Sequence, residues 1–135
     1  MSKYLFAYVA TATVFLAIDF IWLSQVARKF YADALGDLLL ERPNIAAAAG
    51  FYAVYAAGIV FFAVLPAMKS GSALTALTHG ALFGFFAYAT YDMTNYATLR
   101  HWPISVTVVD VIWGSCLTGI SAFAGYLISR QLIGS

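Results

Sequence analysis

Four long apolar stretches divide the chain, and short polar segments separate them. The stretches run from about residue 4 to 27, 45 to 65, 74 to 99 and 104 to 128. Each reaches the roughly 20 residues that a helix needs to cross a hydrocarbon core about 30 Å thick. Helices satisfy their backbone hydrogen bonds within one segment, so the pattern predicts four membrane-spanning helices. Because the connections are short, we expect one domain, residues 1–135, forming an all-α, up-and-down four-helix bundle.

The longest connection, residues 28–44, reads "RKFYADALGDLLLERPN". It mixes charges with three consecutive leucines, Leu38 to Leu40, which predicts a short amphipathic helix at the membrane interface. Pro43 precedes the second apolar stretch, Pro66 ends it, and Pro103 opens the fourth. These are boundary positions that proline tolerates, since it lacks a backbone N–H.

Composition favours a lipid environment. Hydrophobic residues make up 63% of the chain and charged residues 10%, against about 25% charged in soluble domains. A soluble domain this small could not bury so much apolar surface. The net charge of +1 comes from scattered residues, so nucleic acid is not an expected partner. The expected partner is membrane lipid. Four helices are too few to enclose a large pore, so transport would require a homo-oligomer.

Three acids lie inside the apolar stretches: Asp19, Asp92 and Asp110. Counting about 1.5 Å per residue from the stretch ends places all three roughly 9–12 Å below one membrane surface, the one that carries residues 28–44 and 100–103. A carboxylate at the centre of a spanning helix costs about 2.5–3.5 kcal/mol. Bound protons, indole donors, basic side chains from the rim or a cation must therefore offset this cost.

Helical spacing gives these acids neighbours. Trp22 and Trp113 each follow an acid by one turn, within the similar segments "DFIWLS" and "DVIWGS", and Tyr88 and Asn95 lie near the face of Asp92. Both segments lie at one depth, so we interpret their similarity as local rather than as an inverted repeat. The candidate ligand-binding residues are Asp19, Trp22, Tyr88, Asp92, Asn95, Asp110 and Trp113. The aromatic run "FYAVYAAGIVFF", residues 51–62, could line a groove for lipid or pigment, but we favour the interpretation that it faces lipid.

Several motifs, taken together, are specific: "YATYDMTNYATLRHWP" followed by "DVIWG", with "DFIWLS" and "FYADALG" earlier. Through them the chain resembles, over essentially its whole length, a family of small bacterial membrane proteins catalogued as domain of unknown function 2177. The resemblance implies a four-helix protein of the bacterial inner membrane. It implies no activity, substrate or cofactor.

Three functional hypotheses remain open. The acids could bind or translocate a small polar or amphipathic ligand, a cation or a proton, because ionisable residues inside a membrane are usually functional. They could serve an enzyme acting on lipid or isoprenoid, with one carboxyl as general acid or base; such an enzyme needs an apolar groove from the acids into the bilayer. They could also be a polar network that fixes helix packing or assembly. The sequence identifies no catalytic set, metal site or cofactor.

Overall fold

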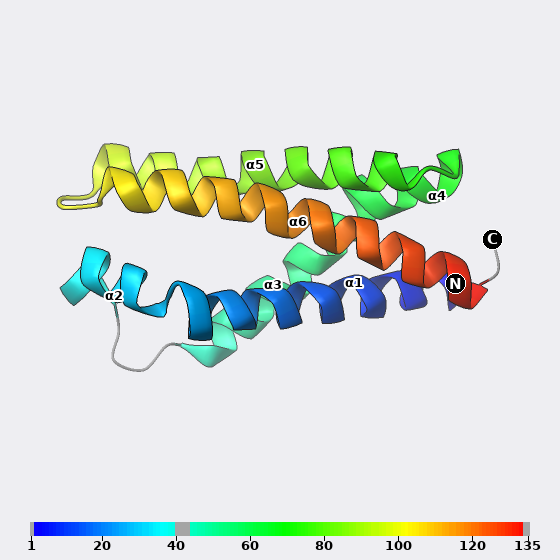
Figure 1. Cartoon of the computed structure of the whole chain (residues 1–135), viewed down its shortest axis with the longest axis horizontal. Helices are drawn as coiled ribbons and strands as arrows, with labels where there is room; N and C mark the ends of the chain where they lie inside the picture. Colours follow the sequence, from blue (N-terminus) through cyan, green and yellow to red (C-terminus); the bar gives the residue numbers. More distant parts are fainter. Residues whose placement is uncertain (1, 40–43, 134–135) are drawn as a thin grey trace.

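The structure, a computed structural model, describes residues 2–39 and 44–133, and these residues form helices joined by short turns (Figure 1). The α-helices are α1 (Ser2–Ile21), α2 (Arg28–Leu35), α3 (Ile45–Ile59), α4 (Leu65–Ser70), α5 (Ala73–Thr98) and α6 (Ile104–Ile133). Within the described ranges there is no strand. The all-α class expected from the apolar pattern is therefore confirmed.

Three helical segments of the described chain are long and apolar enough to cross a membrane. They are Ser2–Val26, Ile45–Ser70 and Ile104–Leu132. Helix α5 is long enough to cross a membrane, but it contains His79, Asp92 and Asn95. Its hydropathy is therefore lower than that of the three candidate spans. Three of the four expected crossings are thus supported by length and composition.

The prediction that Pro66 ends the second apolar helix is wrong. The helix continues from α3 through a π-helical turn, Val60–Val64, into α4. Pro66 lies in the first turn of α4, directly after the change from π to α hydrogen bonding, where its missing N–H is tolerated. The helix ends instead at Gly71, whose left-handed backbone (φ 68°) lets its N–H donate to the Ala67 carbonyl at 2.8 Å.

The connection after α1 also contains a π-helical turn, Trp22–Val26, and then the short helix α2. A short helix was expected in this connection, and it covers only its first part. Gly36 ends it with a positive φ of 51°, and Leu38 and Leu39 beyond it are exposed. The expectations for Leu40 and Pro43 lie outside the described residues.

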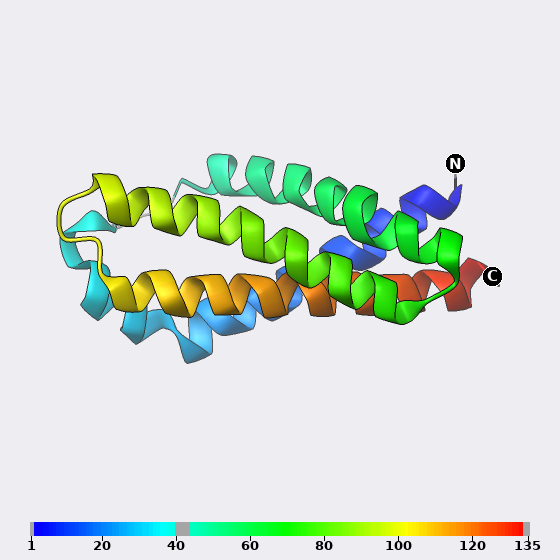
Figure 2. The same ribbon diagram turned by 90° about the horizontal axis from the view of Figure 1, so that it is seen from above.

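Helices α5 and α6 lie side by side along their lengths, and α1 packs against α6 (Figures 1 and 2). A Cβ atom at Gly84 would come 2.7 Å from Thr118 Cβ and would also meet the Gly114 carbonyl oxygen. Only glycine allows this close approach. The 45–70 helix crosses the layer formed by α1, α5 and α6. Helix α3 starts beside α1, whereas the π-helical turn Val60–Val64 and α4 pack against α5. The first half of α3 therefore stands away from α5.

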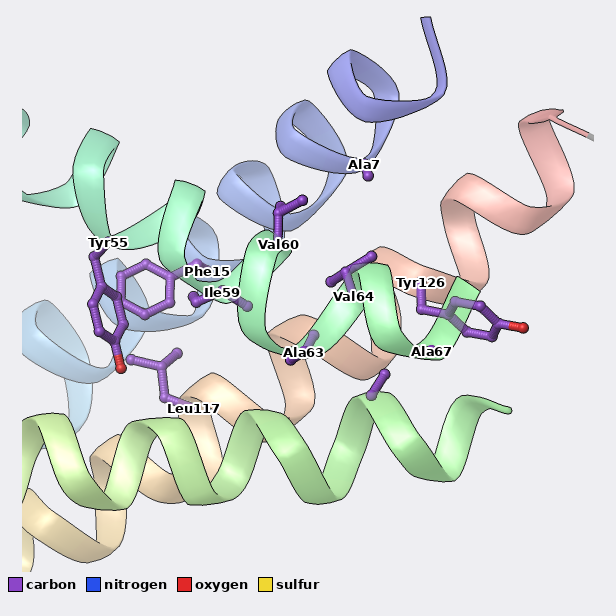
Figure 3. Packing of buried hydrophobic residues seen from close by; sticks show 12 residues of the cluster. Ala7, Phe15, Tyr55, Ile59, Val60, Ala63, Val64, Ala67, Leu117 and Tyr126 are labelled. Carbon is purple, nitrogen blue, oxygen red and sulfur yellow. The ribbon is translucent and has the colours of Figure 1, made fainter. Parts of the chain in front are cut away.

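The apolar core lies where α1, the end of α3, the π-helical turn Val60–Val64, α4 and α6 come together (Figure 3). Phe15, Ile59 and Leu117 fill its middle, and Val64 continues it toward the termini. Both termini lie at this end, whereas α2 and the turn between α5 and α6 lie at the other (Figure 1). The molecule thus has a packed terminal end and, where α3 diverges, a more open end.

Candidate functional site

Asp19 is buried near the end of α1 and receives two hydrogen bonds. The Tyr52 hydroxyl donates to one carboxylate oxygen at 2.7 Å, and Trp113 Nε1 donates to the other at 3.2 Å. The donors come from α3 and α6, so this carboxylate ties three helices together. Hydrogen bonds to a charged acceptor are stronger than neutral ones, which offsets part of the burial cost.

Asp110, near the start of α6, accepts a hydrogen bond from the Tyr31 hydroxyl at 2.9 Å. The Tyr31 oxygen in turn accepts from Trp22 Nε1 at 3.4 Å. Burial, followed by the nearby Asp110 carboxylate, raises the pKa of the Tyr31 phenol above its usual range. Tyr31 therefore stays a hydrogen-bond donor at neutral pH and docks α2 on α6.

The two tryptophans that follow the acids stack on each other. The ring centroids of Trp22 and Trp113 lie 4.2 Å apart, with planes 10° from parallel. Trp113 donates to the acid of the other segment, Asp19, and Trp22 reaches Asp110 through Tyr31. The two similar segments are therefore joined crosswise, and Asp19 and Asp110 belong to one network.

Asp92 differs from the other two acids. Its side chain is fully buried, and neither carboxyl oxygen has a hydrogen-bond partner among the described residues. It faces Asp110 across the α5–α6 contact, because Tyr88, one turn earlier on α5, packs on Gly114, one turn later on α6. Asp92 thus retains free acceptor positions beside Asp110.

A groove with a volume of about 560 Å³ runs between the first half of α3 and helix α5, and Asp110 of α6 lies in its wall. We call it the main groove. Its other lining residues are mostly aromatic: Phe51, Tyr52, Tyr55, Phe83, Tyr88 and Tyr91. The interpretation of the aromatic run 51–62 as facing lipid is therefore wrong for Tyr52 and Tyr55. These side chains point inward, because α3 is tilted away from α5.

Most of the sequence-derived candidates come together at the open end. Asp19, Trp22, Asp110 and Trp113 form the hydrogen-bonded and stacked network, with Asp92 beside Asp110 and Tyr88 in the main groove. Asn95 is half-buried one turn beyond Asp92 and does not line the groove. The rim cations Arg28, Lys29 and Arg100 are exposed.

Sequence reasoning missed two residues that bind the acids, Tyr31 and Tyr52. Tyr31 lies within "FYADALG", a segment noted for its resemblance and not for its chemistry. Tyr52 was assigned with its neighbours to the lipid-facing surface. The acids do not form one chelating set: in the described part of the chain, no three His, Cys, Asp or Glu side chains are placed to hold a metal ion.

The fold and site together define an all-helical membrane protein with an aromatic groove that has one acid, Asp110, in its wall. The family described as "Predicted membrane protein (DUF2177)" matches residues 4–127, and the chain belongs to this family. The resemblance seen in the sequence motifs is thereby confirmed. No curated protein and no solved structure shows significant similarity to the chain.

Proposed function

We propose that the protein crosses the membrane four times and binds a small amphipathic molecule in the main groove. The observation that carries this proposal is the position of Asp110, the charged residue in the wall of an otherwise apolar and aromatic groove. Ligand sites are commonly apolar clefts of about 300–1,000 Å³ with a few convergent polar groups. The apolar part of the ligand would lie on the aromatic side chains, and its polar end would lie at Asp110.

A fourth crossing by α5 follows from its neighbours. It lies along α6, which has the length and composition of a membrane span. Its buried positions include Gly80, Gly84 and Asp92, and these face α6, whereas Leu82 and Phe86 are exposed. A helix that buries its one acid against the bundle and turns large apolar side chains outward is suited to lipid, although its average hydropathy is modest.

The acids define the polar end of the ligand. Asp110 uses one carboxylate oxygen to accept from Tyr31, so it retains further acceptor positions. Asp92 does not line the groove, but it lies beside Asp110 with both oxygens free of partners among the described residues. Trp22 and Trp113 hold this wall in place, and Asn95 lies between Asp92 and the membrane surface. Acceptors dominate, so the ligand's polar end carries a hydrogen-bond donor, such as a hydroxyl or an amine.

A second candidate function is an enzyme acting on a lipid or isoprenoid, and the main groove favours it. Such an enzyme needs an apolar groove that leads from the acids into the bilayer. The Asp92–Asp110 pair would supply a protonated carboxyl as general acid and an ionised one as general base. An enzyme of this kind would bind the same ligand class, so binding is the property to test first.

The test uses bromododecanol brominated at carbon 2, a single-chain alcohol whose bromine lies next to the hydroxyl and quenches tryptophan fluorescence, with purified protein in nanodiscs. Trp22 and Trp113 lie beside the proposed polar end. We expect saturable quenching, and at least about tenfold weaker binding by Asp110→Asn, since about 1.4 kcal/mol corresponds to tenfold and hydrogen bonds to charged groups contribute about 1.5–3 kcal/mol. The matched control is Asp33→Asn, at an exposed position of α2.

Bromododecanoate, with a negatively charged head on the same chain, should bind more weakly because it would face the acids. Equal, non-saturable quenching by both probes would mean that they only dissolve in the bilayer. Binding unchanged by Asp110→Asn, together with a change in oligomeric state, would favour the assembly role instead.

A further inference from the structure

A second groove lies on the other side of α3. It has a volume of about 370 Å³ and runs between α3 and α1. Its walls include Phe15 and Leu16 of α1, and Ala49 and Ala53 of α3. It is apolar along its length apart from the tyrosine hydroxyls of Tyr8 and Tyr52. Tyr8 is already used, because its hydroxyl donates to the Ala53 carbonyl at 2.9 Å.

The two grooves lie back to back across the first half of α3. Ala48 and Tyr52 line both of them. The intervening helix surface is built from the small residues 46–50, "AAAAG", so α3 is thin here. At the point where the grooves share Tyr52, its hydroxyl donates to Asp19. The two grooves therefore flank the first half of α3, and both include the Tyr52 side chain with its polar hydroxyl.

We propose that the ligand is an uncharged lipid with two hydrocarbon chains, of the diacylglycerol class, and that it straddles the first half of α3. This inference rests on the proposed function, which placed one amphipathic chain in the main groove. One chain lies in the main groove and the other in the second groove. The glycerol unit lies over the start of α3, and its free hydroxyl donates to Asp110.

Charge selects the headgroup. Asp110 lines the polar end and Asp19 and Asp92 are buried near it, whereas Arg28, Lys29 and Arg100 are exposed at the rim. A phosphate placed beside these carboxyls would meet like charge in a medium where such repulsion is strong. A hydroxyl carries no charge and can donate a hydrogen bond to a carboxylate. The site therefore favours diacylglycerol over the phospholipids that surround the protein.

The test measures retained lipid by native mass spectrometry of the detergent-solubilised protein. The lipids are dioleoylglycerol, monooleoylglycerol, which has one chain and an uncharged head, and dioleoyl phosphatidic acid, which adds a phosphate. We expect dioleoylglycerol to bind at least about tenfold more tightly than either of the others, a difference of about 1.4 kcal/mol.

Two variants on one helix test the second groove. Ala49→Phe fills it, because Ala49 lines the second groove and not the main one. Ala46→Phe adds the same ring at an exposed position that lines neither groove. We expect Ala49→Phe to weaken dioleoylglycerol about tenfold, a difference of about 1.4 kcal/mol, and to leave monooleoylglycerol unchanged. Ala46→Phe should change neither.

The two proposals fail differently. If monooleoylglycerol binds as tightly as dioleoylglycerol and Ala49→Phe has no effect, the two-chain inference is wrong and the main groove remains a single-chain site. A preference for phosphatidic acid would overturn the uncharged headgroup. If none of the three lipids is retained and bromododecanol also fails to bind, the proposed function itself fails.

Discussion

Asp19 and Asp92 are both buried acids, yet their surroundings assign them different roles. Asp19 holds a bundle together, because it accepts from Tyr52 and Trp113 on two other helices. Asp92 accepts no hydrogen bond from the described residues. Its burial therefore costs free energy that no hydrogen bond offsets. A group that is expensive to bury and makes no structural bond is typical of a binding or catalytic position.

This difference predicts opposite effects of two isosteric substitutions. Asp19→Asn replaces a charged acceptor by a neutral one and should lower the free energy of unfolding by about 1–3 kcal/mol. Asp92→Asn removes an acid that has no structural partner, and its melting temperature should equal or exceed that of the wild type. Thermal unfolding of the purified protein in detergent measures both. Equal losses in the two variants would show that Asp92 is structural.

Tyr31 connects the site to α2, so its hydroxyl should control how firmly that helix is docked. Tyr31→Phe removes the bond to Asp110 and the acceptor for Trp22. We expect a loss of about 0.5–1.5 kcal/mol per bond and faster amide hydrogen exchange in residues 28–35. Tyr96→Phe, an exposed tyrosine of α5, is the control. Unchanged exchange in Tyr31→Phe would show that other contacts dock α2.

The raised pKa of Tyr31 also fixes the direction of a pH effect. The stabilisation by its protonated phenol should be fully present below about pH 10, the usual tyrosine pKa. It should be lost as the pH rises through the higher folded-state pKa, because only the unfolded chain has by then released the proton. Alkaline titration of the exchange rate in α2 should show this loss in the wild type and not in Tyr31→Phe.

The acids and tryptophans of the site could be predicted from the sequence, because charge inside an apolar stretch is costly and stands out. Tyr31 and Tyr52 could not. Tyrosine is common in membrane proteins at interfaces, and nothing local distinguishes a tyrosine that binds an acid from one that faces lipid. Their roles depend on the docking of α2 and on the tilt of α3, which are properties of the tertiary structure.

At the scale of the helix, the apolar pattern predicted where helices form better than where they end. Pro66 was expected to stop a helix, but the π-helical turn Val60–Val64 carries the chain past it. π-helical turns leave no clear pattern in a sequence, because they follow from packing around them. The other π-helical turn, Trp22–Val26, begins three residues after Asp19 and includes Trp22, so a turn of the same kind shapes the site.

The contact between α5 and α6 depends on glycine, which predicts a sharp contrast between two Gly→Ala variants. At Gly84 the new methyl group would meet the backbone of Gly114 and the side chain of Thr118, and such overpacking costs about 1–3 kcal/mol. At Gly50 of α3 it would meet nothing within 4 Å, and helix propensity should make it neutral or up to about 1 kcal/mol stabilising.

Equilibrium unfolding in mixed detergent measures both free energies. An unchanged free energy of unfolding in Gly84→Ala would mean that α5 and α6 can separate to make room for the methyl group. In that case the close helix contact would no longer support the position of Asp92 beside Asp110.

At the scale of the whole molecule, the two ends are built differently. At the terminal end, small side chains such as Ala7, Val64, Ala67 and Ala122 are fully buried. At the other end, α3 diverges and the two grooves open sideways. A ligand would therefore enter and leave from the lipid phase on one side, which favours binding or chemistry over passage across the bilayer.

The proposed fourth crossing predicts the sides on which the turns lie. In a Cys116→Ala background, Lys69→Cys precedes α5 and Arg100→Cys follows it, and both positions are exposed. If α5 crosses the membrane, a membrane-impermeant thiol reagent applied to sealed vesicles should label only one of the two. Labelling of both from the same side would show that α5 does not cross, and the three apolar segments would be the whole membrane anchor.

The glycine contact between α5 and α6 also has a consequence for biogenesis. A helix with the hydropathy of α5 is a poor candidate to leave the insertion machinery for lipid alone, because its carboxyl and imidazole groups would then face hydrocarbon. Helix α6, against which the Asp92 side chain is buried, follows after only a short turn. The two would therefore enter the bilayer together as a helical hairpin, and the start of α6 would be synthesised before α5 is released.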